Sequence, residues 1–174
     1  MYKKNLIVFF IALILLFPSK VNAYDLAQEE KDLFREQGRT VQVLSYDNKQ
    51  LHVTDNDIHL MAKVVHAESV GEPYEGKVAV ASVILNRLKN PAFPKSIEGV
   101  IKQPRAFSCV INGEIKAEPN EHCYRAVIDA LSGKDPTNNS LFFYNPKIAT
   151  STWMKNVEKD NVKSIGNHVF FIAK

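Results

Sequence analysis

The stretch from Tyr74 to Lys89 constrains the fold more than any other part of the chain, because apolar residues occupy nearly every side of the helix that it predicts. Such a helix has to be surrounded by other elements, since an exposed position would leave an apolar face in water. Pro73 suits the start of this helix, and Gly71 stops the helix before it. The sequence therefore predicts a domain that is built around one central helix.

The segments on either side predict the elements that surround this helix. Thr54 or Asp55 can cap a preceding helix that runs to about Ser69, and a weak alternation at residues 40–44 suggests a short strand. Two more helices and two strands are expected at Ser96–Gln103, Glu121–Leu131, Ser140–Tyr144 and His168–Ile172. Helices followed by a small antiparallel β region near the C-terminus indicate the α+β class.

The N-terminus predicts export. Lys3 and Lys4 precede an unbroken apolar run over residues 6–17, and Pro18 and the small-residue site that ends at Ala23 follow it. These are the parts of a secretory signal, which we expect to be cleaved before Tyr24. A retained membrane anchor is the alternative, but the run is shorter than the roughly 20 residues that span a bilayer. The expected parts are a signal peptide at 1–23, a polar N-terminal extension at 24–55 and a main domain at 56–174.

Cleavage would also change the charge balance. The predicted signal holds Lys3, Lys4 and Lys20 and no acid, so its removal lowers the basic side chains from 22 to 19, against 19 acidic ones. The basic character of the precursor therefore gives no indication of a nucleic-acid partner, and we expect none.

The two cysteines, Cys109 and Cys123, lack the Cys-x-x-Cys spacing of a metal site. In an exported chain, a disulfide between them is the expectation. Two reduced thiols, one of them buried, are the alternative, because a lone pair in a secreted bacterial protein need not be oxidised.

One acidic residue continues an apolar stripe. Ile58, Met61 and Val65 fall at helical spacing, and Glu68 lies on the same face, which should point into the protein. A carboxylate there is costly unless it is paired, or lies at a cleft as a proton donor with a raised pKa. Both interpretations stay open on these residues alone: an ion pair with Arg87 or a lysine, or a catalytic acid.

Other polar residues near the central helix predict structural roles. Glu72 and Glu75 suit the N-terminus of that helix, where an acid is favourable. Asn86 and Arg87 lie near its end and should tie down loops, although Asn86 could also face a cleft.

Several blocks in the right order over most of residues 58–171 resemble the catalytic domain of the SleB/CwlJ cell wall hydrolases, the spore cortex-lytic group. The matching blocks are Ala67–Gly76, Val78–Ala81, Val83–Arg87, Val100–Ile101, Pro104–Ser108, Ala130–Thr137, Phe143–Pro146, Ala149–Ser151 with Trp153, and Ile165–His168. The resemblance implies a lysozyme-like fold, peptidoglycan glycan strands as substrate and Glu68 as the catalytic acid. It also implies a location in the cell wall or spore envelope and a role in cortex lysis at germination.

The domain organisation differs from that of the group. The segment 24–55 is too short for the separate peptidoglycan-binding module that spore enzymes often carry. Cortex and vegetative wall are therefore both open as substrates. We expect a monomer without cofactor or metal, with a possible accessory wall or membrane protein.

The number of carboxylates bears on the mechanism. Direct hydrolysis of a glycosidic bond normally uses two carboxylates, whereas one suffices if the C6 hydroxyl of muramic acid attacks its own anomeric carbon. Glu68 is the one acid of this motif that is expected to lie on a buried face. This favours a lytic transglycosylase, which leaves 1,6-anhydromuramic ends. Hydrolysis by a muramidase or glucosaminidase is the alternative, with Asp129 or Asp135 as the partner acid.

A sugar cleft needs aromatic and amide side chains. Tyr144, Asn145, Thr150 and Trp153 supply such a set after the first C-terminal strand, and Phe107 could line the floor. The alternative for the aromatic residues is core packing, which we expect for Phe142.

Two other functions compete with glycan cleavage. His52, His59 and His66 recur every seven residues and could suggest a zinc amidase or peptidase, but no HExxH motif or Cys/His cluster accompanies them. A wall-binding protein without catalysis is the other alternative, and the presence of Glu68 argues against it.

Overall fold

The structure is a computed structural model that describes residues 42–46 and 49–174. These residues lie in the compact unit from Val41 to Lys174. The predicted signal peptide and most of the predicted extension lie outside the described residues. Within the described ranges, no helix combines the length and the apolar character that crossing a membrane requires.

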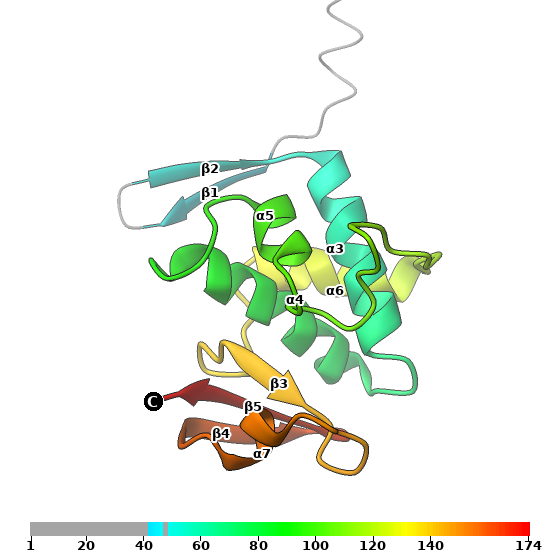
Figure 1. Cartoon of the computed structure of the whole chain (residues 1–174). Coiled ribbons are helices and arrows are strands. Elements are labelled where there is room, and N and C mark those ends of the chain that lie inside the picture. The colour runs from blue at the N-terminus through cyan, green and yellow to red at the C-terminus, as the bar shows by residue number, and fades with distance from the viewer. Residues whose placement is uncertain (1–41, 47–48) are drawn as a thin grey trace, which may run out of the picture. The chain divides into compact units, whose positions relative to one another are not determined.

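Helix α4 (Tyr74–Lys89) is the centre of a helical lobe, as predicted. Every residue from Val78 to Leu88 is buried. Three helices pack against α4 or against its neighbours (Figure 1): α3 (Asp55–Glu68), α5 (Ile97–Lys102) and α6 (Glu121–Leu131). The all-round apolar pattern of α4 is therefore satisfied by burial on all sides.

Local capping explains where α3 and α6 begin. Thr54 is the N-cap of α3: its hydroxyl accepts from the backbone N–H of Asp57 at 3.2 Å, and the Asp57 carboxylate accepts from the backbone N–H of Thr54 at 3.0 Å. This reciprocal capping box satisfies two backbone donors that a helix start leaves without partners. Asn120 caps α6 by accepting from the backbone N–H of Cys123.

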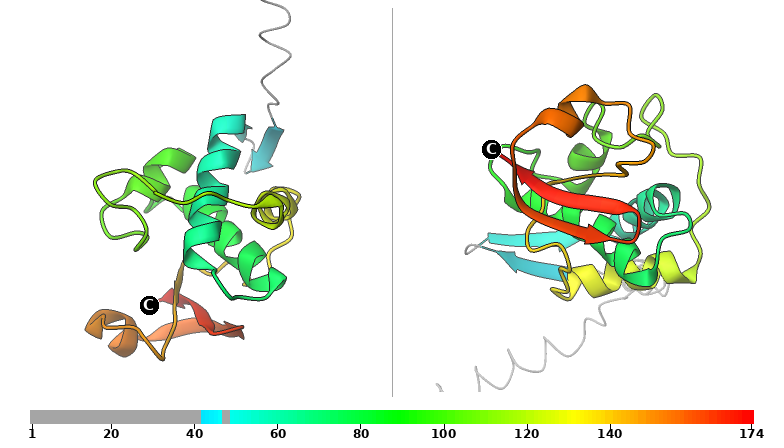
Figure 2. Two further views of the ribbon diagram at one scale, coloured as in Figure 1. Left: turned by 90° about the vertical axis from the view of Figure 1, so that its right-hand side faces the viewer. Right: turned by 90° about the horizontal axis from the view of Figure 1, so that it is seen from below.

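The β region consists of a hairpin and a small sheet. Strands β1 (Gln42–Tyr46) and β2 (Lys49–Val53) form the hairpin, where one strand at 40–44 was expected. Strands β3 (Phe142–Tyr144), β4 (Lys159–Ile165) and β5 (His168–Ala173) form an antiparallel sheet in the order β3-β5-β4. Figure 2 shows this sheet as a separate layer beside the helical lobe.

Besides β2, the sequence predictions miss two elements. Strand β4 escapes detection because most of its side chains are exposed and polar, so no apolar alternation marks it. The five-residue helix α7 (Thr152–Asn156) has no buried residue and hence no apolar stripe. The predicted α+β class, with the β sheet near the C-terminus, is correct.

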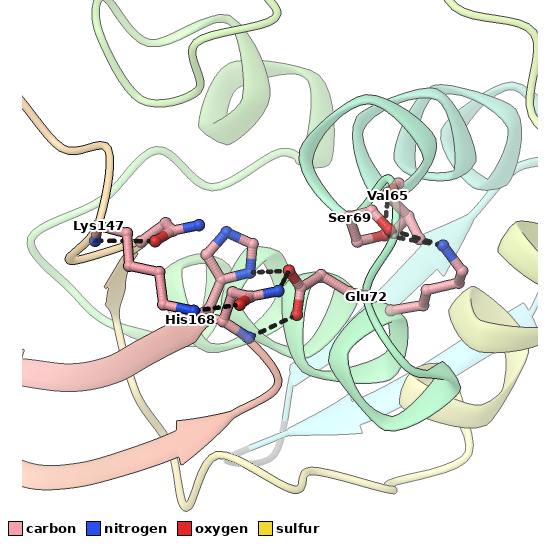
Figure 3. A network of polar contacts seen from close by, with 8 residues as sticks. Val65, Ser69, Glu72, Lys147 and His168 are labelled. Atoms are coloured by element: carbon pink, nitrogen blue, oxygen red, sulfur yellow. Dashed lines mark hydrogen bonds and ion pairs between the residues drawn. The ribbon is translucent and has the colours of Figure 1, made fainter.

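A buried carboxylate joins the sheet to the helical lobe. Glu72 lies in the turn between α3 and α4 with its side chain only 4% exposed. Its two oxygens accept hydrogen bonds from Asn167, at 2.9 Å from the backbone N–H and at 3.1 Å from the side-chain amide (Figure 3). The side chain of Lys147 donates to the Asn167 amide oxygen at 3.2 Å, and the His168 ring lies 3.9 Å from the carboxylate. The expectation that Glu72 caps α4 is wrong: Pro73 is the N-cap, and no side chain caps that helix start.

Gly166 makes this contact possible. Its φ is +60°, and a Cβ atom at this position would lie 1.9 Å from a Glu72 carboxylate oxygen. Because a real Cβ cannot approach so closely, any other residue would push the β4–β5 turn away from Glu72.

We predict that Gly166→Ala destabilises the protein by about 3 kcal/mol, because it adds the loss of buried carboxylate hydrogen bonds to the strain of a positive φ. Gly113→Ala is the matched control: Gly113 has φ +80°, but a Cβ atom added there would meet nothing within 4 Å. We expect a loss of only about 1 kcal/mol there. Denaturant unfolding of both variants measures the difference, and equal losses would contradict the role given to the Glu72 contact.

Candidate active site

Glu68 is the last residue of α3 and is half-buried. One of its carboxylate oxygens, Oε1, accepts two hydrogen bonds: from the hydroxyl of Ser108 at 3.0 Å and from the backbone N–H of Cys109 at 3.1 Å. The other oxygen, Oε2, accepts none from the nitrogen and oxygen donors of the described residues. The nitrogen and oxygen donors therefore fix the carboxyl group through one oxygen, and the Cys109 thiol lies against the same carboxylate.

The helix end that carries Glu68 is closed by its neighbours. The side chain of Lys77, on α4, donates to the carbonyl of Ser69 at 2.7 Å, and the Ser69 hydroxyl donates to the carbonyl of Val65 (Figure 3). A cation at a helix C-terminus satisfies free carbonyls and opposes the negative end of the helix dipole. These contacts fix the backbone next to Glu68.

Arg87 is buried between aromatic rings near Glu68. Its guanidinium lies 4.9 Å from the Phe107 ring centroid and 5.6 Å from those of Phe93 and Phe142. It donates to the carbonyls of Leu141 at 2.8 Å and Ala106 at 3.4 Å, so it ties down loops as predicted.

Burial lowers the pKa of Arg87 to about 10, although the negative charge of Glu68 acts to raise it. The group is thus still a cation at neutral pH. Within the described part of the chain, Glu68 forms no ion pair with Arg87 or a lysine. The ion pair that would give Glu68 a purely structural role is therefore not observed.

The two candidate partner acids are engaged elsewhere. Asp129 pairs with Lys134 at 2.8 Å and accepts from the Tyr74 hydroxyl at 3.0 Å, and these two hydrogen bonds lower its pKa. Burial alone would raise the pKa of Asp135, but hydrogen bonds from Thr137, Asn86 and Asn139 outweigh it and lower the pKa. Both carboxylates serve as structural acceptors. Asn86, which donates to Asp135, is accordingly a loop anchor.

The predicted disulfide is not formed. Cys109 and Cys123 are both free thiols. The sulfur of Cys123 is buried on α6, 3.8 Å from the His66 ring and 3.3 Å from the Asn120 side chain. Cys109 lies in the loop that holds Glu68, so the two thiols are packed against different partners.

The residues expected to line a sugar cleft differ in what they offer a ligand. Trp153 is 49% exposed and packs its edge against Phe142, with 5.3 Å between ring centroids. Thr150 is exposed, whereas Phe107 is buried under Arg87. Tyr144 packs edge-on against Phe171, and the Asn145 side chain accepts from the backbone N–H of Lys147. Trp153 and Thr150 are thus the most exposed members of the set, whereas Tyr144 and Asn145 are half-buried. Phe142, which was expected in the core, is only half-buried and lies outside the core cluster, although it packs against Phe171 with 5.6 Å between ring centroids.

The histidines do not form a metal site. His59 hydrogen-bonds the Tyr124 hydroxyl at 2.6 Å, and His66 contacts Cys123. No group of three potential metal ligands occurs among residues 42–46 and 49–174.

Ser108 was missed as a site residue. It belongs to one of the blocks that carry the family resemblance, but its role depends on a contact with a residue 40 positions earlier. Only the folded chain brings the two together.

Comparisons with known proteins identify the family of this chain. A family model described as cell wall hydrolase matches residues 71–171. The spore cortex-lytic enzyme of Oceanobacillus iheyensis is 50% identical over 117 residues, which cover 67% of this chain and 42% of that protein. The corresponding enzyme of Bacillus subtilis is 49% identical over 117 residues, or 38% of its length. The chain belongs to the cell wall hydrolase family, and it spans less than half the length of these curated relatives.

Solved structures match over nearly their whole length. The catalytic domain of the Bacillus cereus SleB protein aligns with a TM-score of 0.64 and 47% identity, covering 73% of this chain and 98% of that one. The catalytic domain of the germination-specific lytic transglycosylase SleB from Bacillus anthracis aligns with a TM-score of 0.63 and 49% identity, covering 68% and 96%. The fold expected from the family resemblance is therefore confirmed.

We predict that the Cys109 thiol is unusually slow to alkylate. Burial and the adjacent Glu68 carboxylate raise its pKa to about 12, so the reactive thiolate is scarce at neutral pH. In a Cys123→Ser variant, the alkylation rate of the folded protein should still be rising at pH 10, whereas the urea-unfolded chain should level off near the ordinary thiol value of 9.0. A folded-state rate that levels off at the same pH as the unfolded one would contradict the placement of Cys109 beside Glu68.

Proposed function

We propose that this protein cleaves peptidoglycan glycan strands as a lytic transglycosylase, with Glu68 as general acid and then general base. The observation that carries the proposal is the fixing of Glu68 Oε1 by Ser108 and by the Cys109 backbone. Two donors on one oxygen orient the carboxyl group, and a proton on Oε2 can then be given to a leaving group. The description of the Bacillus anthracis relative as a lytic transglycosylase supports the same reaction.

The reaction balances with one carboxyl group. Glu68 donates its proton to the glycosidic oxygen, and the bond from that oxygen to the anomeric carbon of muramic acid breaks. The carboxylate then takes the proton of the C6 hydroxyl, whose oxygen bonds to the anomeric carbon. The products are a free 4-hydroxyl and a 1,6-anhydromuramic end, and no water is consumed.

The other carboxylates support this route over hydrolysis. A hydrolase normally uses a second carboxylate to activate water or to attack the sugar. Asp129 and Asp135 are held by other side chains, and Glu72 is buried against Asn167. Of these four carboxylates, Glu68 is the one that is not engaged through both oxygens, and it is the acid of the proposed mechanism.

The names of the relatives support a location in the cell wall or spore envelope. We expect the protein to reach it after removal of the predicted signal near Ala23. The substrate would be glycan strands of cortex or of vegetative wall. We expect the protein to act as a monomer without a cofactor or nucleic-acid partner. An accessory wall or membrane protein could assist it.

We predict that Glu68→Gln keeps the fold and lowers the rate of strand cleavage by about a thousandfold, because the amide has no acidic proton to give. Its carbonyl oxygen can still accept from Ser108 and Cys109, so the loop should stay in place. Glu75→Gln, at an exposed position in the first turn of α4, is the matched control and should be as active as wild type. Circular dichroism and release of soluble muropeptides measure fold and activity. A folded Glu68→Gln protein with substantial activity would refute the role of Glu68.

We predict that digestion in oxygen-18 water leaves the new muramic ends without the label. Internal attack by the C6 hydroxyl incorporates no solvent oxygen, whereas a hydrolase places solvent oxygen on the anomeric carbon. Mass spectrometry of the released muropeptides distinguishes the products, and an authentic muramidase provides the labelled control. Labelled reducing ends would instead identify this protein as a hydrolase with a second carboxylate.

A further inference from the structure

A pocket of about 320 Å³ adjoins the proposed acid. Ala67, which precedes Glu68 in α3, forms one side of it. Cys109, whose backbone N–H holds Glu68, forms another. The pocket is therefore lined by two residues attached to Glu68, one through the chain and one through a hydrogen bond, although Glu68 itself is not part of the lining.

The far wall of the pocket is a preformed turn. Ile111 and Glu114 pair in a β-bridge through two backbone hydrogen bonds of 2.9 and 3.0 Å. Asn112 and Gly113 between them have φ of +52° and +80°, the signature of a tight two-residue hairpin. Ile115, which follows, is buried in the core and anchors the turn. A ligand thus meets a wall that needs little ordering, which favours binding.

The lining combines apolar side chains with charges of both signs. Ile111, Ile115 and Ala67 are apolar, while Glu114 and Lys116 carry opposite charges. Throughout the part of the chain that the structure describes, the side chains of Glu114 and Lys116 make no hydrogen bond or ion pair. Both charges are exposed and available to a ligand.

We propose that this pocket binds the peptide stem of a muramic acid residue beside the cleaved bond, an inference that rests on the proposed function. Lys116 would face a stem carboxylate, and Glu114 would face the free amino group of the diamino acid in the stem. The apolar side chains would contact the alanine methyl groups. The protein is then selective for strands that carry peptide stems over strands without them.

The lining argues against a bare sugar as the occupant. Carbohydrate rings are typically held by stacking on aromatic side chains. None of the residues that line this pocket is aromatic. A stem that carries both charges matches Glu114 and Lys116, whereas an uncharged N-acetyl sugar has no charge to offer them.

The test compares two soluble ligands on the Glu68→Gln protein, which should bind without turnover. One ligand is a disaccharide with a peptide stem, and the other is the same disaccharide without it. Titration calorimetry should show the stem-bearing ligand binding about tenfold more tightly, and Lys116→Glu should remove most of this preference. Lys95→Glu, in an exposed loop outside the pocket lining, is the matched control and should keep it.

Equal affinities for the two ligands, no measurable binding of the stem-bearing one, or a preference that survives Lys116→Glu would overturn the proposal. This result differs from a failure of the proposed function. If wild-type protein releases anhydro products while the preference is absent, only the proposal that this pocket binds the peptide stem is refuted. If the wild-type protein cleaves no strands but the preference is present and depends on Lys116, the pocket is confirmed as a binding site. The proposed transglycosylase activity is then refuted.

Discussion

The contact between Glu72 and the β4–β5 turn is the interaction on which the arrangement of this molecule depends. It joins a turn at the end of the acid-bearing helix to residues 95 positions later in the chain. The carboxylate is almost fully buried and has lost its hydration. Each hydrogen bond from Asn167 therefore replaces a hydrogen bond to water. The sheet cannot shift relative to α3 and α4 without exposing this carboxylate to water or leaving it without hydrogen bonds. Lys147 extends the same network to the loop that follows β3, where the candidate sugar-binding residues begin.

Two carboxylates four residues apart therefore have opposite roles. Glu72 is saturated by Asn167, and its charge serves to hold two parts of the protein together. Glu68 is half-buried and is fixed through one oxygen only. The sequence separates them only by position: Glu68 continues the apolar stripe of its helix, and Glu72 precedes Pro73 at the start of the next one. The difference arises from what each meets in the folded chain, which is why acids with different functions can share one short segment.

The elements that sequence reasoning predicted are those with local causes. The central helix follows from its apolar pattern, and the start of α3 follows from the capping box at Thr54 and Asp57. The missed features depend on distant partners or lack a pattern. Strand β4 is polar and exposed, Glu72 has its partner at Asn167, and Ser108 becomes a site residue only beside Glu68. The disulfide was expected from cellular compartment alone, whereas bonding depends on geometry that the spacing of two cysteines does not contain.

The loop that orients Glu68 is itself held by the central helix. Arg87 donates to the carbonyl of Ala106 and lies over the ring of Phe107, so the positions of the next two residues are set from α4. These residues supply the hydroxyl and the backbone N–H that hold Glu68. The backbone donor is present with any side chain at position 109, and the orientation of the acid thus depends more on where the loop runs than on the identity of that side chain. A buried arginine among aromatic rings fixes that path without pairing with the acid, which leaves Glu68 free for the proposed proton transfer.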